Sequence, residues 1–566
     1  MKNDDPTPLV REHRGRWYTK GGRGFQAATV LLIVASLSAS GFLMSCLLRP
    51  PEKSSGGAAT QNDAKSGGLP AFLFHDWPKD PDLVLVLTGE RHGYVQPCGC
   101  SSPQVGGVER LYNLVQLLKN ERGWTVLPLD LGDTPQREGP AGLPNVQGVL
   151  KYYYTMRAME KIGFRATSFG EYEAAQPLPF LLDHLFQDPA LTLPPVLACN
   201  VHDRQKQFMP DKIEQIASWK IAEAKGSKLK VGVIGAIGVD VGDAVHKVDR
   251  SLSFDDLRTI LPETIKDMDA KNPDLRVLLY HGKPAQAKVL AERMTKFDVI
   301  LSMSDEDEAP SKADQSGKTM IVPGLGHKGK NIGVVGVWRT GKAAKPFDLR
   351  YQQVRLGEEF LTPKDPEKDH PITKLMEEYA KEVQTGEYLA KYPQTRMHPL
   401  HGVYKDDEEN KDKEVKYVGS AACKSCHKEV YAIWEKSNHA RAYKTLVEIA
   451  KRPSLRQYDA ECIVCHTIGF TERGGFTNAE DTPNLKNVGC ESCHGPGSPH
   501  LEDNYDKKVL ALMNPFKEKP GESEIQKKQR VLKLQDSCRK CHDLENDVNW
   551  EFDKRWPDIV HKEPKQ

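Results

Sequence analysis

The sequence lacks an excess of charge of either sign. Its 566 residues include 79 Lys and Arg against 78 Asp and Glu, which leaves a net charge of +1. Proteins that bind nucleic acid need a basic excess to neutralise phosphates, so this balance argues against that class. The mean hydropathy of −0.56 excludes a polytopic membrane protein. There is no Walker-type or dinucleotide-binding glycine loop. The length predicts two to four domains at about 100–200 residues each.

The N-terminus has the pattern of an export segment. Residues 1–24 hold six Lys or Arg against three acidic residues, and residues 25–48 carry no charge. About 20 apolar residues span a bilayer, and a basic flank stays cytoplasmic, so the body of the protein should be exported. We expect an uncleaved membrane anchor, with lipidation of Cys46 in a lipobox-like Leu-Met-Ser-Cys or a cleaved secretory signal as alternatives. Residues 49–80 are predicted to form a flexible tether.

Eight of the twelve cysteines follow one repeated pattern. Cys-x-x-Cys-His occurs four times, where chance gives roughly 0.008 matches per chain, and this is the attachment signature of haem c. Two thiols one helical turn apart reach the two vinyl groups of a haem, and the adjacent His is the proximal ligand of the iron. Zinc sites do not require a His after each second Cys. The pattern predicts four covalently attached haem c groups, held by Cys423, Cys426 and His427, by Cys462, Cys465 and His466, by Cys490, Cys493 and His494, and by Cys538, Cys541 and His542. Haem c is attached outside the cytoplasm, in agreement with an exported chain.

The spare histidines near these motifs are candidates for the sixth iron ligand. After residue 417 the chain has three beyond the proximal ones, His439, His500 and His561. His398 and His401, just upstream, are further candidates, whereas we expect Met513 to serve in packing. Three spare histidines for four haems predict three bis-His centres and one centre that is open or filled from elsewhere. The sequence alone does not show which His serves which haem.

The same region resembles the tetrahaem cytochrome c-554 family. The similarity lies in residues 417–427, 434–440, 489–500 and 556–561, and it extends over about 417–566. The resemblance implies a mostly helical fold around closely packed haems, with three bis-His haems and one five-coordinate haem. It also places His439, His500 and His561 where that family has distal ligands.

The middle of the chain has the pattern of an α/β layered domain. Residues 83–87 form a short apolar run typical of a buried parallel strand, and apolar residues at 111, 114, 115 and 118 predict an amphipathic helix. Further predicted strands are 125–127, 230–234, 276–280, 298–301, 319–322 and 332–337, with predicted helices at 254–270 and 285–296. Strands that alternate with helices indicate a layered α/β fold.

Polar residues at the predicted strand ends resemble calcineurin-like metallophosphoesterases, in particular the N-terminal domain of 5′-nucleotidases. The similar segments are 88–93, 129–133, 167–173 and 279–282, and the resemblance covers about 81–356. It implies a two-metal site for phosphate ester hydrolysis, in which two metals hold the attacking and the leaving oxygens.

Only part of that metal site is kept. Glu90 stands for the family's first Asp, and His92, Asp133 and His281 match. The family's Gly-Asn-His-Glu is Gly-Glu-Tyr-Glu at 170–173, and its Gly-His-x-His is Ser-Met-Ser-Asp at 302–305. We therefore favour a non-catalytic scaffold. The alternatives are a one-metal or rebuilt site of Glu90, His92, Asp133 and His281, and an active phosphohydrolase.

Three cysteines remain outside both patterns. Cys98 and Cys100 lie close after the first metal-like motif, and Cys199 follows later. A structural disulfide, soft-metal ligation, redox chemistry and free thiols all stay open for them.

The predicted organisation is a basic N-terminus (1–24), an anchor (25–48), a tether (49–80), a phosphoesterase-like domain (81–356), a linker (357–416) and a haem domain (417–566). The mixed charges at 405–416 predict a solvated hinge, with docking of a redox partner as the alternative. The favoured function is electron transfer on the periplasmic side to a redox protein or a quinone-linked membrane complex, without nucleic acid. The alternatives are a haem oxidoreductase that acts on a small nitrogen or sulfur species, and a phosphohydrolase with an accessory cytochrome domain.

Overall fold

The structure is a computed structural model that describes residues 68–97, 102–176, 191–205, 216–343, 345–363, 369–450 and 453–561. The predicted anchor, Cys46, Cys98 and Cys100 lie outside these ranges. Within them, no helix combines the length and the apolar character needed to cross a bilayer.

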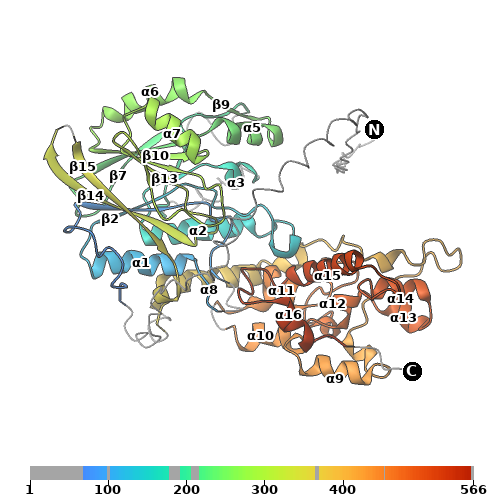
Figure 1. Ribbon diagram of the computed structural model, residues 1–566. Helices are drawn as coiled ribbons and strands as arrows, with labels where there is room; N and C mark the ends of the chain where they lie inside the picture. The colour runs from blue at the N-terminus through green and yellow to red at the C-terminus, as the bar shows by residue number, and fades with distance from the viewer. Residues whose placement is uncertain are drawn as a thin grey trace, which may run out of the picture. The chain divides into compact units, whose positions relative to one another are not determined.

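The first predicted strand lies inside a seven-stranded sheet, whose strands β2, β14 and β15 are labelled in Figure 1. The strand β1 (Leu83–Thr88) pairs in parallel with β2 (Val126–Asp130), so that Leu87 lies opposite Leu129. Short parallel strands β3 (Thr167–Ser168), β4 (Val196–Leu197) and β6 (Ile216–Ala217) continue the sheet on this side. On the other side, β14 (Asn331–Lys342) and β15 (Lys345–Arg355) are antiparallel.

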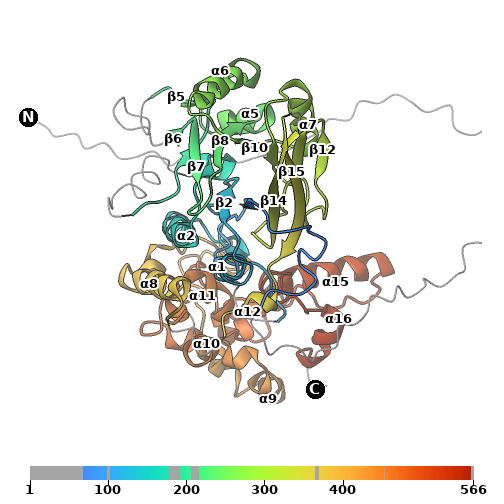
Figure 2. The ribbon, with the colours of Figure 1, turned by 90° about the vertical axis from the view of Figure 1, so that its left-hand side faces the viewer.

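A six-stranded sheet faces the first one (Figure 2). Its parallel strands are β8 (Lys230–Ile237), β10 (Leu275–His281), β11 (Val299–Ser302) and β13 (Thr319–Pro323), with antiparallel edges β7 (Trp219–Glu223) and β12 (Asp314–Ser316). Alternation along β1 explains the layers: Leu83, Leu85 and Leu87 pack into the core between the sheets, whereas Val84 and Val86 pack into the outer core with the helices. A small third sheet pairs β5 (Val201–Asp203) with β9 (Leu252–Phe254) beside α5 (Val239–Val248).

Helices cover the two outer faces. The first sheet is covered by α1 (Val108–Asn120) and α2 (Gly148–Ile162), and the second by α6 (Leu257–Asp269) and α7 (Pro284–Arg293). The predicted helix at 254–270 starts three residues later than expected, because the Asp256 side chain caps it by accepting from Arg258 N. The predicted α/β layered domain is therefore confirmed as a four-layer sandwich.

The region predicted as a linker contains a packed helix. The helix α8 (Pro371–Thr385) buries Ile372, Leu375, Met376 and Val383 in the same cluster as α1 and α2. Residues 405–414 form exposed turns, as a solvated segment should.

The C-terminal region consists of short helices with little apolar core. These are α9 (Lys428–Lys436), α10 (Ala442–Glu448), α11 (Ala460–His466), α12 (Cys490–His494), α13 (Ser498–Glu502), α14 (Lys507–Met513), α15 (Glu524–Arg539) and α16 (Phe552–Arg555). The 16-residue helix α15 has no buried residue at all. A packed helix normally buries an apolar stripe, so large non-protein groups would have to supply the missing contact surface.

Candidate functional site

Each Cys-x-x-Cys-His motif occupies one helical turn. The second and third motifs lie inside α11 and α12. In the first and fourth, the His backbone N–H donates to the carbonyl of the first Cys, at 3.0 Å in both His427 and His542. Residues three apart on a helix lie on one face, so both thiols of each motif can reach one haem.

Three proximal histidines each face a second imidazole from a distant part of the chain. The ring centroids are 6.0 Å apart for His427 and His500, 6.0 Å for His542 and His439, and 5.9 Å for His494 and His561. Metal–imidazole bonds are about 2.0–2.1 Å long and the ring centroid lies roughly 1 Å behind the nitrogen, so two rings on one metal have centroids about 6 Å apart. Each of the three pairs could therefore hold one iron between its two rings, and this spacing gives the pairing that the sequence left open.

The fourth proximal histidine has a different environment. Within the described part of the chain, no imidazole faces His466, whose Nδ1 donates to the Ala442 carbonyl at 2.6 Å. His401 instead bonds through Nε2 to the Arg473 carbonyl (2.9 Å), and Nδ1 of His398 accepts from Leu400 N (3.2 Å). Met513 packs with Val509 and its neighbours, and its backbone carbonyl accepts from His494 Nδ1. A haem at His466 would be open on its second side.

Three of the four proximal histidines have a hydrogen bond at Nδ1 among the described residues. Nδ1 donates to a backbone carbonyl in His466 and in His494, and to the Asp547 carboxylate at 2.9 Å in His542. A proton held on Nδ1 leaves Nε2 as the ligating nitrogen. Desolvation lowers the pKa of His466 and of His494, which favours the neutral ring that metals bind.

Contacts between the attachment thiols place the four motifs in a spatial series. The Cys423 thiol lies beside that of Cys490, and the Cys541 thiol lies beside that of Cys465. Cys493 lies close enough to Cys538 and Cys541 to interact with them electrostatically. The series therefore runs from the first motif to the third, then to the fourth and finally to the second.

The phosphoesterase-like residues gather at the carboxyl ends of the parallel strands, where α/β folds place their sites. Glu90 and His92 follow β1, Asp133 follows β2, and His281 ends β10. Glu90, His92 and Asp133 have φ values of 50°, 49° and 50°, a left-handed conformation that is unusual outside glycine and clusters at functional sites. Three of the four predicted site residues therefore share this unusual backbone conformation.

Within this site, Asp133 and His281 each have a buried polar atom without a hydrogen-bond partner among the described residues. Asp133 Oδ2 lies 3.6 Å from His281 Nδ1, both side chains are fully buried, and neither atom has a hydrogen-bond partner among the described residues. The other ring nitrogen of His281 donates to the Leu131 carbonyl. Burial raises the pKa of Asp133, although the His281 ring opposes that shift.

The carboxylates of this site accept hydrogen bonds from backbone N–H groups. Glu90 accepts from Ser304 N at 2.8 Å, and Asp133 Oδ1 accepts from Tyr172 N at 2.8 Å. Glu173 accepts from the N–H groups of Asp133, Thr134 and Gly170 at 3.0–3.1 Å. Burial, and then the charge of Asp133, raise the pKa of Glu90 and of Glu173 well above the usual range, which favours neutral carboxyl groups.

Aromatic rings fill the space beside His92. Its ring stacks on Tyr172 with centroids 4.1 Å apart, and burial lowers its pKa to about 3. The sequence did not point to His327, whose Nε2 lies 3.7 Å from Glu90 Oε1 and whose Nδ1 donates to Asp307 at 2.6 Å. Among the residues that the structure describes, no three His, Cys, Asp or Glu side chains converge in a way that could hold a metal ion. The residues present therefore do not fit the two-metal centre of the family.

Comparison with known proteins finds similarity to cytochromes in the C-terminal region. Residues 422–495 match the family model of cytochrome c554 and c-prime. Cytochrome c-554 of Nitrosomonas europaea is 31% identical over 136 residues, which are 22% of this chain and 57% of that protein. The chain thus spans little more than half the length of this relative. The family implies covalently bound haem c, which fits the attachment motifs and the paired imidazoles.

Solved structures similar to the N-terminal region include a 5′-nucleotidase precursor and a calcineurin-like phosphoesterase. A 5′-nucleotidase precursor from Thermus thermophilus has 19% identity and a TM-score of 0.42, covering 56% of this chain and 61% of its own. A calcineurin-like phosphoesterase from Bacillus subtilis has 17% identity and a TM-score of 0.40, covering 53% and 96%. The reduced cytochrome c554 from Nitrosomonas europaea has 27% identity and a TM-score of 0.19, covering 25% and 82%.

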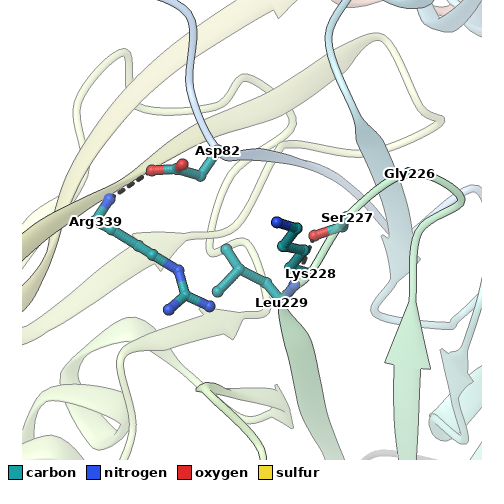
Figure 3. A pocket seen from close by; sticks show the side chains of 6 residues that line it. All are labelled: Asp82, Gly226, Ser227, Lys228, Leu229 and Arg339. Atoms are coloured by element: carbon teal, nitrogen blue, oxygen red, sulfur yellow. Dashed lines mark hydrogen bonds between the residues drawn. The ribbon is translucent and has the colours of Figure 1, made fainter.

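Two remaining features lie away from both sites. An open hollow lined by Asp82, Leu229 and Arg339 lies where β1 and β8 begin, opposite the carboxyl ends that carry the site residues (Figure 3). Cys199 is a free thiol, and burial raises its pKa to about 12. A disulfide to Cys199 is therefore wrong in this structure, because its thiol packs inside the outer core of the second sheet.

Proposed function

We propose that this protein is an exported electron-transfer protein with four covalently attached haem c groups. The observation that carries the proposal is the set of three histidine pairs whose rings lie 5.9–6.0 Å apart, each with one member in an attachment motif. Haem supplies an iron that is reversibly oxidised by one electron. Two fixed imidazoles on one iron leave no position for substrate, so these three centres would carry electrons only.

The order of the motifs supports a relay between two ends. The thiol contacts place the first motif at one end of the series and the second motif, with His466, at the other. Electrons that enter near His427 would pass the third and fourth motifs before reaching His466. The chain's residues contribute by fixing the attachment points and the ring orientations.

A second candidate function is a haem oxidoreductase that acts at His466. It is favoured by the absence, in the described ranges, of an imidazole opposite this ring, whereas the other three proximal histidines have one. A small nitrogen or sulfur species could then bind iron on the open side.

We propose a non-catalytic role for the phosphoesterase-like sandwich. Its carboxylates accept hydrogen bonds from backbone amides, as described for Glu90 and Glu173. Helix α2 also holds the helix of the second motif: Gln147 donates to Asp459 at 3.0 Å, and Lys151 pairs with Glu461 at 2.6 Å. The sandwich would thus be a scaffold for the haem-bearing region. The rebuilt one-metal site and the phosphohydrolase remain the less favoured alternatives.

We propose that residues 25–48 anchor the protein in the cytoplasmic membrane with its body on the periplasmic side, and that lipidation at Cys46 is the alternative anchor. Support comes from the charge pattern of residues 1–48 and from attachment of haem c outside the cytoplasm. The partners would be redox proteins or a quinone-linked membrane complex.

Redox titration of the purified full-length protein tests the main proposal. Four attachment motifs predict that each chain takes up four electrons reversibly. The absorption band of reduced haem c measures this uptake. If the haem at His466 is open, as the second candidate function also requires, carbon monoxide should change the reduced spectrum of one haem in four. Uptake of fewer than four electrons contradicts the tetrahaem proposal, and turnover of a phosphate ester with a bound divalent metal contradicts the scaffold role.

A further inference from the structure

The proximal histidine of the fourth motif differs from those of the second and third motifs in what its second ring nitrogen contacts. His466 and His494 donate from Nδ1 to the backbone carbonyls of Ala442 and Met513. His542 instead faces a carboxylate, with Nδ1 2.9 Å from Asp547 Oδ2. A charged acceptor makes a stronger hydrogen bond than a neutral carbonyl.

A tight turn directly after the motif holds this carboxylate in place. Asp543 accepts from the N–H groups of Glu545 and Asn546 at 2.9 and 2.7 Å, and Asp547 N donates to the Asp543 carbonyl at 2.9 Å. On the other side of the turn, Trp550 stacks on the His542 ring, with centroids 5.5 Å apart and an interplanar angle of 15°. The His542 and Asp547 side chains are only 32% and 30% exposed, so water screens the contact incompletely.

A carboxylate on Nδ1 changes what the imidazole gives to a metal on Nε2. It draws the Nδ1 proton toward itself, so the ring becomes a better electron donor. Greater donation favours ferric over ferrous iron, and hydrogen bonding around an axial ligand is one of the ways in which a protein sets haem potential. The other axial ligand does not offset this effect, because His439 is an imidazole like the distal ligands of the other two pairs.

We propose that Asp547 is a positioning residue that gives the haem of the fourth motif the lowest reduction potential of the three bis-His centres. The inference rests on the proposed function, in which His542 and His439 hold this haem. The thiol contacts place this motif between the third and the second. Its low potential therefore forms a step that electrons must cross on the way to the open position at His466.

The test is a spectroelectrochemical titration of the full-length holoprotein and of Asp547→Asn. Replacement of the carboxylate by an amide should raise one of the four midpoint potentials, that of the lowest low-spin haem, and leave three unchanged. Asp547→Glu should restore a value near that of the wild type. Asp536→Asn is the matched control, because Asp536 is an exposed carboxylate on α15 that contacts Arg539 and not the ring of His542. Unchanged potentials, or an equal shift in the control, overturn the inference.

A second variant keeps the inference testable if Asp547→Asn fails to fold with four haems. His439→Ala, with Asp547 intact, should convert the haem of His542 to a high-spin spectrum. The low-spin transition that disappears from the titration must then be the one with the lowest midpoint potential of the three. Loss of a higher wave overturns the role of Asp547, whereas a wild type without three low-spin haems overturns the proposed function itself.

Discussion

At the scale of single residues, the structure adds to the sequence the partner of each proximal histidine in the three facing pairs. His427 and His500, like the members of the other two pairs, lie far apart in the chain and meet only through the tertiary fold. The residue types and their number follow from the sequence, because Cys-x-x-Cys-His is a local pattern. The pairing does not, because nothing local in the sequence encodes a contact between distant loops.

Removal of one distal histidine should affect one haem. His500→Ala should convert the haem of the first motif from low spin to high spin, because His427 would lose its facing ring. Electron paramagnetic resonance at low temperature measures the change. The control is His398→Ala, since Nδ1 of His398 accepts from Leu400 N and its ring faces none of the proximal rings in the described ranges. Loss of low-spin signal in the control, or its persistence in His500→Ala, contradicts the assignment.

Glu173 should be a stability residue of the sandwich. Glu173→Ala would leave three backbone N–H groups without an acceptor, two of them from Asp133 and Thr134, at a cost of about 3 kcal/mol or more in the free energy of unfolding. Urea unfolding followed by circular dichroism measures this. Glu171→Ala, which removes only a surface ion pair with Arg137, should cost less than about 1 kcal/mol. Equal effects would show that the buried network contributes nothing.

The protonation of Glu90 predicts a pH dependence with a definite sign. Burial and Asp133 raise its pKa well above that of the unfolded chain, so its contribution to stability is full at acidic pH and is lost as pH rises through the raised pKa. Glu90→Gln removes this group and should make the melting temperature less sensitive to alkaline pH. Thermal unfolding between pH 5 and pH 9 measures the difference. If the melting temperature of Glu90→Gln falls as steeply with rising pH as that of the wild type, the account is contradicted.

At the scale of elements, helix α2 connects the sandwich to the helix of the second motif. Gln147 is fully buried, and its amide joins the Tyr379 hydroxyl of α8 and the Asp459 carboxylate, which caps α11. Lys151 lies one turn further along α2 and pairs with Glu461. The attachment helix that bears His466 is thereby fixed at its first turn.

Loss of this ion pair should loosen α11. The side chains of Lys151 and Glu461 are only 13% and 16% exposed, so Lys151→Met leaves a poorly hydrated carboxylate and should cost about 1–3 kcal/mol. Chemical denaturation followed by the absorption of the haems measures it. Lys161→Met is the control on the exposed end of α2 and should change the free energy of unfolding by less than about 0.5 kcal/mol. If both variants behave alike, the contact does not hold the helix.

The sequence predicted those helices and strands that have an apolar pattern within their own residues. The run of leucine and valine in β1 and the apolar stripe of α1 both occur where expected. The sequence carries no such stripe at α15, none of whose 16 residues is buried. Asp547 and His327 were also missed, because a carboxylate or an imidazole in a loop has no local signal for the ring that it contacts.

At the scale of the whole molecule, two folds with different requirements are joined in one chain. The sandwich has its own apolar cores between and outside the sheets. Within the described residues, the C-terminal region has only two small apolar clusters, around Ile463 and Val509. Part of it, residues 422–495, matches the family model of cytochrome c554 and c-prime. Its stability should therefore depend on haem attachment, while that of the sandwich should not.

The most direct test of the central claim is the spin state of the irons in the resting holoprotein, counted against protein by electron paramagnetic resonance with haem quantification. The account predicts four haems per chain, three low-spin and one high-spin, with only the high-spin centre binding carbon monoxide after reduction. This ratio follows from the three facing histidine pairs and from His466, which no imidazole of the described chain faces. Four low-spin irons, or fewer than four haems per chain, would contradict the account.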